Sequence, residues 1–255
     1  MVTFVPAGRC GNFLFECATA YAYAKKHNLE FTVPFETSDE FHSPIYVKHL
    51  QNPNYIKNVE TIYIEETQHN FQEIPFQEDW RHKNIVIDGY RQTEKYFKEY
   101  REDILNAFGF PWEMKKGVVS VHVRRGDYLT LTEKHPPVPI EWIRQAMFMM
   151  NSMEKESVME FKRFKFKFFS DDIQWCKSNF DYRDDCEFSE GNSIEQDLID
   201  ISHCEHHINS SSTFSWWGAY LNRNKDKIVI TPKSWFGVAQ KENTSDIIPE
   251  NWIKL

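Results

Sequence analysis

Short apolar runs alternate along this chain with longer amphipathic stretches, a pattern typical of strands followed by helices. The runs Val2–Val5, Ile85–Ile87 and Val118–Val123 are too short for helices. They therefore predict strands, and the β-branched run Val118–Val123 predicts a strand buried on both faces, as in a parallel sheet. Phe164–Phe169 alternates phenylalanine with lysine, which predicts a strand with one wet face. Lys227–Thr231 predicts one further strand.

Helical spacing of apolar residues fills the segments between these strands. Predicted helices cover Phe13–His27, Thr93–Phe108, Pro139–Met153, Ser193–Ser202 and a segment that opens at Phe214. The strand–helix order predicts an α/β protein with parallel sheets. Proline and glycine between Pro111 and Gly117 mark a domain boundary. We therefore predict an N-terminal domain over residues 1–115 and a C-terminal domain over residues 116–255.

Composition limits the partners and the cellular compartment that can be expected for this protein. The formal net charge is −8, which argues against a nucleic-acid or anionic-membrane partner. No apolar run reaches the roughly 18 residues of a membrane-spanning helix, and the first residues lack a signal-peptide pattern. The five cysteines are odd in number and form no Cys-x-x-Cys pair, as expected of reduced thiols. These features predict a cytoplasmic protein without a membrane-spanning segment.

Three polar loops follow predicted strands in the second half of the chain: Arg124–Asp127, Ser170–Asp172 and Ser210–Thr213. Ligands of open parallel sheets bind at the carboxyl ends of strands. The first loop offers guanidinium groups, the second carboxylates, and the third hydroxyls at a helix N-terminus. Together they predict a nucleotide-diphosphate pocket. For each loop alone, a surface ion pair or simple helix capping remains an alternative.

Two other stretches invite a functional interpretation. Gly8–Asn12 lies between a strand and a helix, where it can present backbone N–H groups to an anion or only allow close packing. His203–His207 is rich in histidine, but consecutive residues cannot all converge on one ion, so we do not expect a metal site there. The chain also contains no Asp-x-Asp motif, the usual metal clamp for a sugar-nucleotide diphosphate. We predict that arginine and a helix N-terminus carry the leaving-group charge without metal.

Several motifs resemble the α-1,2-fucosyltransferase family, glycosyltransferase family 11. They are His122-Val-Arg-Arg-Gly-Asp-Tyr128, Phe169-Ser-Asp-Asp172, Ser211-Ser-Thr-Phe-Ser-Trp-Trp217, the opening Gly8-Arg-Cys-Gly-Asn12, and Gly89-Tyr90 with Tyr96-Phe97. The resemblance implies a GT-B fold, two Rossmann-like domains facing across a cleft. It also implies an inverting, metal-independent transfer of L-fucose from GDP-fucose to the 2-hydroxyl of a terminal galactose in a glycan. A GDP-sugar hydrolase and a non-catalytic nucleotide- or glycan-binding protein remain alternatives.

The same resemblance assigns roles to individual residues. Arg124 would hold the diphosphate, His122 and Asp172 would contact the nucleoside, Asn12 would approach the donor from the N-terminal domain, and Ser211, Ser212 and Thr213 would bind phosphate. Arg125 would brace the loop through a neighbouring carboxylate. Asp127 is a candidate general base because it lies beside Arg124, although an ion pair with that arginine would weaken it. The chain departs from the family pattern at Cys10, Phe13 and Ser211, which leaves acceptor choice open.

Overall fold

The computed structural model describes residues 1–34, 45–51, 59–108, 111–153 and 164–255. The chain divides into two compact units. Unit 1 contains Met1–Pro111 together with Glu242–Pro249, and unit 2 contains Trp112–Lys241 together with Glu250–Leu255. Both units are built on parallel β-sheets, so the α/β class predicted from the sequence is confirmed.

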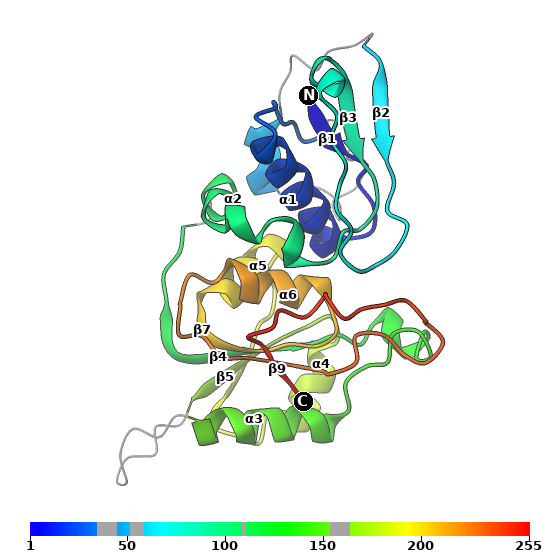
Figure 1. Cartoon of the computed structure of the whole chain (residues 1–255). Coiled ribbons are helices and arrows are strands. Elements are labelled where there is room, and N and C mark those ends of the chain that lie inside the picture. The colour runs from blue at the N-terminus through cyan, green and yellow to red at the C-terminus, as the bar shows by residue number, and fades with distance from the viewer. Residues whose placement is uncertain (35–44, 52–58, 109–110, 154–163) are drawn as a thin grey trace. The chain divides into compact units, whose positions relative to one another are not determined.

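Unit 1 has a three-stranded parallel sheet in the order β1-β3-β2, with β1 at Val2–Phe4, β2 at Thr61–Ile64 and β3 at Asn84–Ile87. Helix α1, Cys10–Lys26, packs beside β1 (Figure 1), where the rings of Phe4 and Phe13 meet edge to face. Short 3₁₀ turns occupy Ile45–Leu50 and Glu78–His82. The sheet and α1, which is buried at every position from Phe13 to Ala20, therefore form the core of this unit.

The single helix predicted over Thr93–Phe108 is wrong. This segment forms two 3₁₀ turns, Glu94–Tyr96 and Lys98–Tyr100, followed by the short helix α2 at Arg101–Ala107. Phe97 interrupts the helix because its backbone adopts φ −141° and ψ 2°. That conformation buries the Phe97 ring completely, against Phe15 of α1. Core packing thus outweighs the helical spacing of the neighbouring aromatic residues.

Unit 2 has a six-stranded parallel sheet in the order β6-β5-β4-β7-β8-β9. The strands are β4 at Lys115–Val123, β5 at Lys165–Ser170, β6 at Cys186–Phe188, β7 at Cys204–Ile208, β8 at Val229–Thr231 and β9 at Ile253–Lys254. The helices are α3 at Ile140–Met153, α4 at Ile173–Phe180, α5 at Ile194–His203 and α6 at Thr213–Leu221. A 3₁₀ turn follows β4 at Asp127–Leu129.

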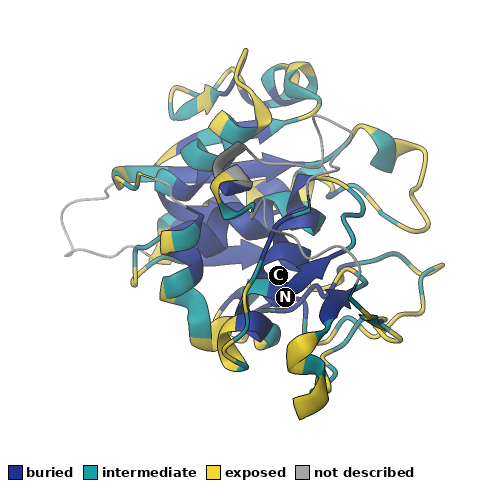
Figure 2. Ribbon diagram, turned by 90° about the horizontal axis from the view of Figure 1, so that it is seen from above, coloured by how far each residue is buried: buried dark blue, intermediate teal, exposed yellow. Residues whose placement is uncertain are grey.

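Helices cover both faces of this sheet (Figure 1): α3 and α4 lie on one face, and α5 and α6 lie on the other. Alternate residues of β4 serve the two faces, as strand geometry requires. Val119, Val121 and Val123 join the apolar core on the side of α3 and α4. Val118 packs into the smaller cluster with Ile201 of α5. Central strands are accordingly buried, as their dark blue colour in Figure 2 shows.

Strand β7 begins at Cys204, inside the histidine-rich stretch His203–His207. Its histidines are buried because each finds hydrogen-bond partners inside the sheet. His207 Nδ1 lies 2.8 Å from the hydroxyl of Ser120, and Asn222 Nδ2 lies 2.8 Å from its Nε2. His206 Nδ1 accepts a hydrogen bond from the backbone N–H of Ile228. Burial lowers the pKa of His207 far below its usual range, so this strand carries neutral imidazole.

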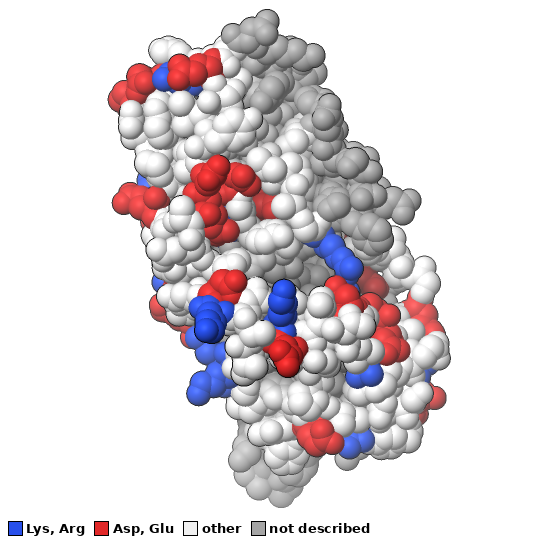
Figure 3. Space-filling model, turned by 90° about the vertical axis from the view of Figure 1, so that its right-hand side faces the viewer, with Lys and Arg blue, Asp and Glu red and all other residues white. Residues whose placement is uncertain are grey.

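On the face shown in Figure 3, acidic and basic side chains of the described residues lie interspersed. Within the described ranges, no helix combines the length and the apolar character needed to cross a membrane.

Candidate functional site

The candidate site lies at the carboxyl edge of the sheet in unit 2. Strand β4 pairs with β5 on one side and β7 on the other, and all three are parallel. The loops that begin at Arg124, Asp171 and Asn209 therefore leave the sheet side by side. This edge is where open parallel sheets bind ligands.

Arg124 is held by two carboxylates. Its Nη1 lies 2.8 Å from Oδ2 of Asp171, and its Nη2 donates to Oδ1 of Asp127. The guanidinium also lies over the ring of Tyr128, 5.5 Å from its centroid. Its side chain is 18% exposed, so the charge is partly shielded from water. A guanidinium has five N–H donors, which leaves donors for an anion once the two carboxylates are served.

Arg125 points toward the neighbouring strand's loop. Its Nε donates to Oδ2 of Asp172 at 3.0 Å, and its backbone N–H donates to Oδ1 of Asp171 at 2.9 Å. The guanidinium stacks on the ring of Trp175, 4.0 Å from the centroid. These contacts tie the loop after β4 to the loop after β5 and so fix where Arg124 emerges.

The carboxylate of Asp172 makes two structural contacts. Besides pairing with Arg125, it is the N-cap of α4, where its Oδ1 accepts from the backbone N–H of Trp175 at 3.2 Å. Each carboxylate oxygen has two lone pairs, so the group retains capacity for a further donor. Its predicted contact with a nucleoside stays a prediction.

His122 is the penultimate residue of β4 and is buried. Its Nδ1 lies 2.7 Å from the hydroxyl of Ser210 in the loop after β7. Burial, with a smaller contribution from the positive charge of Arg124, lowers the pKa of His122 to about 3. The imidazole is thus neutral at physiological pH and acts as a hydrogen-bonding group rather than a cation.

The Ser211–Thr213 segment forms the start of α6. Ser212 is the N-cap, and its hydroxyl accepts from the backbone N–H of Phe214 at 3.3 Å. The hydroxyl of Ser211 donates to the carbonyl of Ser234, while the Ser211 carbonyl accepts from the hydroxyl of Tyr128 at 2.9 Å. Thr213 is the first residue of the helix and is half-buried. Ser212 therefore caps the helix and Ser211 links neighbouring loops, which leaves the helix N-terminus to attract an anion.

Asn12 belongs to unit 1. The structure places it in the first turn of α1, which begins at Cys10, rather than in the preceding turn. Its Oδ1 accepts from Nε2 of Gln92 at 3.0 Å. Gly8, at φ +68°, packs so closely that a Cβ there would lie 2.2 Å from Asn12 Nδ2. The glycine at this position thus serves close packing around Asn12.

Sequence reasoning missed Asp171 as an individual residue of the site, although its carboxylate contacts both arginine residues. It also packs against Gly126, where a Cβ would lie 2.4 Å from Asp171 Oδ2. The available signal was its place in the Ser170–Asp172 loop. The decisive fact is the strand register, in which Val123 pairs with Ser170 and so sets the two loops opposite one another.

No group of three or more His, Cys, Asp or Glu side chains that could hold a metal ion occurs in the part of the chain that the structure describes. The arrangement can instead offer an anion two kinds of electrostatic partner: a guanidinium at Arg124 and the N-terminus of α6. The carboxylate of Asp127, next to Arg124, is placed to accept a proton nearby.

Comparisons with known proteins agree with the motifs. Residues 1–255 match the model of glycosyl transferase family 11. The chain is 34% identical over 189 residues to an alpha-1,2-colitosyltransferase of Escherichia coli, covering 68% of this chain and 63% of that protein. It is 25% identical over 251 residues to galactoside alpha-(1,2)-fucosyltransferase 2 of Oryctolagus cuniculus, covering 87% and 67% respectively. The chain thus spans about two thirds of the length of these relatives, slightly less for the bacterial one.

Among solved structures, the chain resembles the fucosyltransferase NodZ from Bradyrhizobium, with a TM-score of 0.50 and 15% identity over 86% of this chain and 92% of that one. At that identity the likeness concerns the fold alone. The family match covers the full sequence and confirms the resemblance carried by the motifs. The chain therefore belongs to glycosyl transferase family 11.

Proposed function

We propose that this chain transfers L-fucose from GDP-fucose to the 2-hydroxyl of a terminal galactose in a glycan, with inversion and without a metal ion. The observation that carries the proposal is Arg124, anchored between Asp127 and Asp171 beside the N-terminus of α6. Family membership and the α-1,2-specific names of two relatives support the reaction type.

In the proposed reaction, the acceptor oxygen attacks the anomeric carbon from the face opposite GDP. The bond between that carbon and the β-phosphate oxygen breaks, and its electron pair stays with the diphosphate. Arg124 would stabilise the negative charge that grows there, aided by the N–H groups at the start of α6. Because two carboxylates already orient the guanidinium, little reorganisation is needed when charge develops.

The acceptor hydroxyl loses its proton as the new bond forms. Asp127 is the proposed base, and in the ligand-free structure it pairs with Arg124. A diphosphate bound to the remaining donors of Arg124 would share its positive charge and so weaken its attraction for Asp127, while Asp171 keeps the guanidinium oriented. The base would then become available when the donor is bound.

The remaining assignments belong to the same proposal. His122 and Asp172 would contact the nucleoside, Ser211, Ser212 and Thr213 the phosphates, and Asn12 the donor from the N-terminal domain. We also propose the GT-B arrangement that the resemblance implies, with residues 1–115 on the acceptor side and residues 116–255 on the donor side.

A second donor is favoured by one observation: the bacterial relative at 34% identity is named a colitosyltransferase. Colitose is L-fucose without its 3-hydroxyl. A site that hydrogen-bonds that hydroxyl discriminates strongly against the deoxy sugar, whereas an apolar site does not. The ratio of kcat/KM for GDP-fucose and GDP-colitose separates the two donors.

The test is GDP release from GDP-fucose in EDTA, with and without lactose or N-acetyllactosamine, followed by NMR assignment of the product linkage. We expect release that depends on acceptor and an α-1,2 product. Equal release without acceptor would identify a hydrolase, and binding of GDP with no release from any acceptor or either donor would identify a binding protein.

A further inference from the structure

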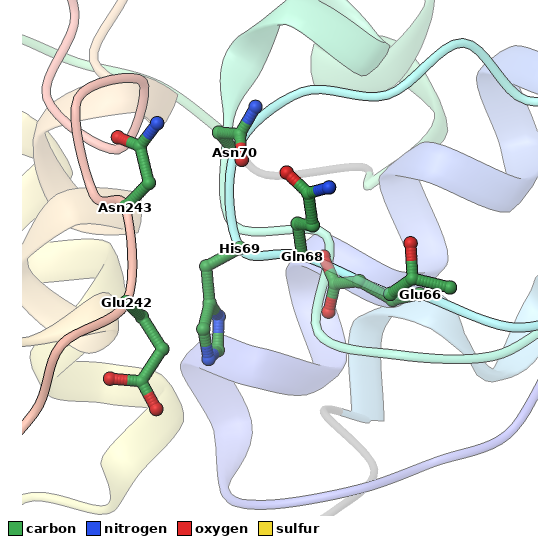
Figure 4. Close-up of a pocket in the computed structure, with 7 residues that line it drawn as sticks. Glu66, Gln68, His69, Asn70, Glu242 and Asn243 are labelled. Carbon is green, nitrogen blue, oxygen red and sulfur yellow. The ribbon is translucent and has the colours of Figure 1, made fainter.

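Unit 1 contains a pocket of about 430 Å³ at the carboxyl end of β2 (Figure 4). One wall is formed by residues 66–70. Only Glu65 separates this run from Ile64, the last residue of β2. The other wall is Glu242 and Asn243, from the C-terminal segment that belongs to unit 1. The pocket thus occupies the edge of a parallel sheet at which ligands bind, and its volume is within the usual range of about 300–1,000 Å³.

Each lining residue carries a polar or charged side chain. It offers the carboxylates of Glu66 and Glu242, the amides of Gln68, Asn70 and Asn243, a threonine hydroxyl and the imidazole of His69. In Figure 4 the side chains of His69 and Glu242 extend in the same direction from the two facing walls. Such a surface can both accept and donate hydrogen bonds at several points.

This chemistry narrows the class of ligand. No lysine or arginine is among the described lining residues, and the two carboxylates would repel a phosphate. No metal-holding group of His, Cys, Asp or Glu occurs among the described residues. An apolar ligand would leave many polar groups without partners, at a cost for each. A neutral molecule rich in hydroxyls, such as a sugar, fits the lining best.

The floor of the pocket is held rigidly. Oε1 of Glu66 accepts from the backbone N–H of Arg91 at 3.0 Å. Arg91 adopts φ +50°, a conformation that a non-glycine residue keeps only when its surroundings enforce it. Its buried side chain donates to the carbonyl of Ile64 at 3.1 Å and so links the pocket to the end of β2. Strained backbone of this kind is concentrated at functional sites.

The walls are also tied together. The backbone N–H of Phe71 donates to Oδ2 of Asp246 at 3.0 Å, and Lys95 pairs with the other oxygen of the same carboxylate. The C-terminal segment is therefore fastened to the loop after β2. Near this junction, Oδ1 of Asn70 is buried and accepts no hydrogen bond from the described residues. A buried acceptor without a donor is costly.

We propose that this pocket binds a sugar unit of the glycan acceptor, with Glu242 and the amides of Asn70 and Gln68 as its main hydrogen-bonding groups. The inference rests on the proposed function for the identity of the ligand as an acceptor. It adds the place and the residues that recognise that acceptor. Glu66 orients the floor rather than serving as the main ligand-binding group, because one of its oxygens is already engaged by Arg91.

The test compares Glu242→Ala and Asn70→Ala with a matched control, Glu65→Ala. Glu65 is exposed, precedes the lining residues in the same loop and does not line the pocket. With lactose and N-acetyllactosamine as acceptors, each pocket variant should raise the acceptor KM about tenfold or more, as loss of a hydrogen bond to a charged or buried group predicts. The KM for GDP-fucose and the slow release of GDP without acceptor should stay within twofold of wild type, and the control should match wild type throughout.

A binding measurement separates this inference from the proposed function. Saturation-transfer NMR with the same oligosaccharides should show contact with wild type and the control but weaker contact with both pocket variants. If glycan binds in this way while no fucose is transferred, the pocket stands and the transferase proposal falls. If transfer occurs and the pocket variants keep the wild-type acceptor KM, the pocket proposal is overturned and the transferase stands. Absence of contact with any galactose-terminated oligosaccharide would also overturn it.

Discussion

The two units place different functional groups at the carboxyl edges of their parallel sheets. In unit 2, the loop after the central strand presents two arginines and lies beside the N-terminus of α6. In unit 1, the loop after β2 presents Glu66, and a pocket there combines carboxylates with amides. The same strand geometry thus serves two chemistries, and the loop residues decide which. An edge with guanidinium groups beside a helix N-terminus suits the diphosphate of a donor, whereas an edge with carboxylates and amides alone suits a neutral sugar.

The largest loss of activity is expected when Arg124 is replaced. Arg124→Ala removes the guanidinium beside the departing diphosphate, so kcat/KM should fall by about 10²–10³-fold. The matched control is Arg144→Ala, because Arg144 is an exposed arginine on α3. Steady-state GDP release measures the effect, and circular dichroism checks that the fold is intact. Turnover near wild type in Arg124→Ala would remove the basis for treating this edge as the donor site.

The next prediction concerns the base that accepts the proton of the acceptor hydroxyl. Asp127→Asn keeps the size of the side chain and an oxygen that can accept from Arg124 but removes the base, so kcat should fall by about 10²-fold or more. Affinity for GDP should change little, since Asp171 still orients Arg124. Calorimetric titration with GDP and the pH profile of kcat separate the two quantities. A kcat close to wild type would transfer the role of base to another group.

A smaller effect is expected at the carboxylate that positions both arginines. Asp171→Asn weakens the ion pair with Arg124 and the hydrogen bond from the N–H of Arg125. Hydrogen bonds to charged groups contribute about 1.5–3 kcal/mol, so GDP should bind about tenfold more weakly. Asp181→Asn is a suitable control, because Asp181 is an exposed aspartate just beyond α4. Equal loss of GDP affinity and of thermal stability in Asp171→Asn would point to a structural role instead.

The sequence predicted the parts of the fold that rest on local signals. The run Val118–Val123 in β4 is short and rich in β-branched residues, so a strand buried on both faces could be predicted directly. The run Ile85–Ile87 in β3 likewise predicted a strand. Strand β7 was harder to place because Glu205, His206 and His207 look polar. They become buried only because partners distant in sequence, such as Ser120 and Asn222, satisfy the histidines. Helical spacing was likewise misleading around Phe97, where tertiary packing sets the backbone.

The candidate site likewise has a part that local sequence signals predicted and a part that only tertiary contacts determine. The types of residue that could hold a diphosphate were visible as an Arg-Arg-Gly-Asp loop and a serine-rich helix start. Their pairings were not visible, because the contact of Arg124 with Asp171 depends on the register of β4 against β5. The pocket in unit 1 was missed for a similar reason: Glu66 and Glu242 are 176 positions apart, and only the return of the C-terminal segment brings them together.

The last prediction tests the acidic edge of unit 1 through its stability. Glu16 on α1 is buried, and burial raises its pKa to about 9, with smaller contributions from Asp88 and Glu66. The folded state therefore keeps a proton on Glu16 that the unfolded chain loses above about pH 4.5. Between pH 4.5 and pH 9 the folded state binds more protons, so this group lowers the free energy of unfolding as pH rises.

Glu16→Gln has no proton to lose and should flatten that dependence. Urea unfolding at pH 6 and pH 9 should show a smaller fall in unfolding free energy for the variant than for wild type. The control Glu99→Gln changes an exposed glutamate of the same unit and should leave the difference between the two pH values unchanged. An identical fall in wild type and Glu16→Gln would mean that Glu16 is ionised in the folded state. The acidic edge would then be better hydrated than its burial indicates. The contrast with the arginine-bearing edge of unit 2 would then depend only on the residues that line the pocket.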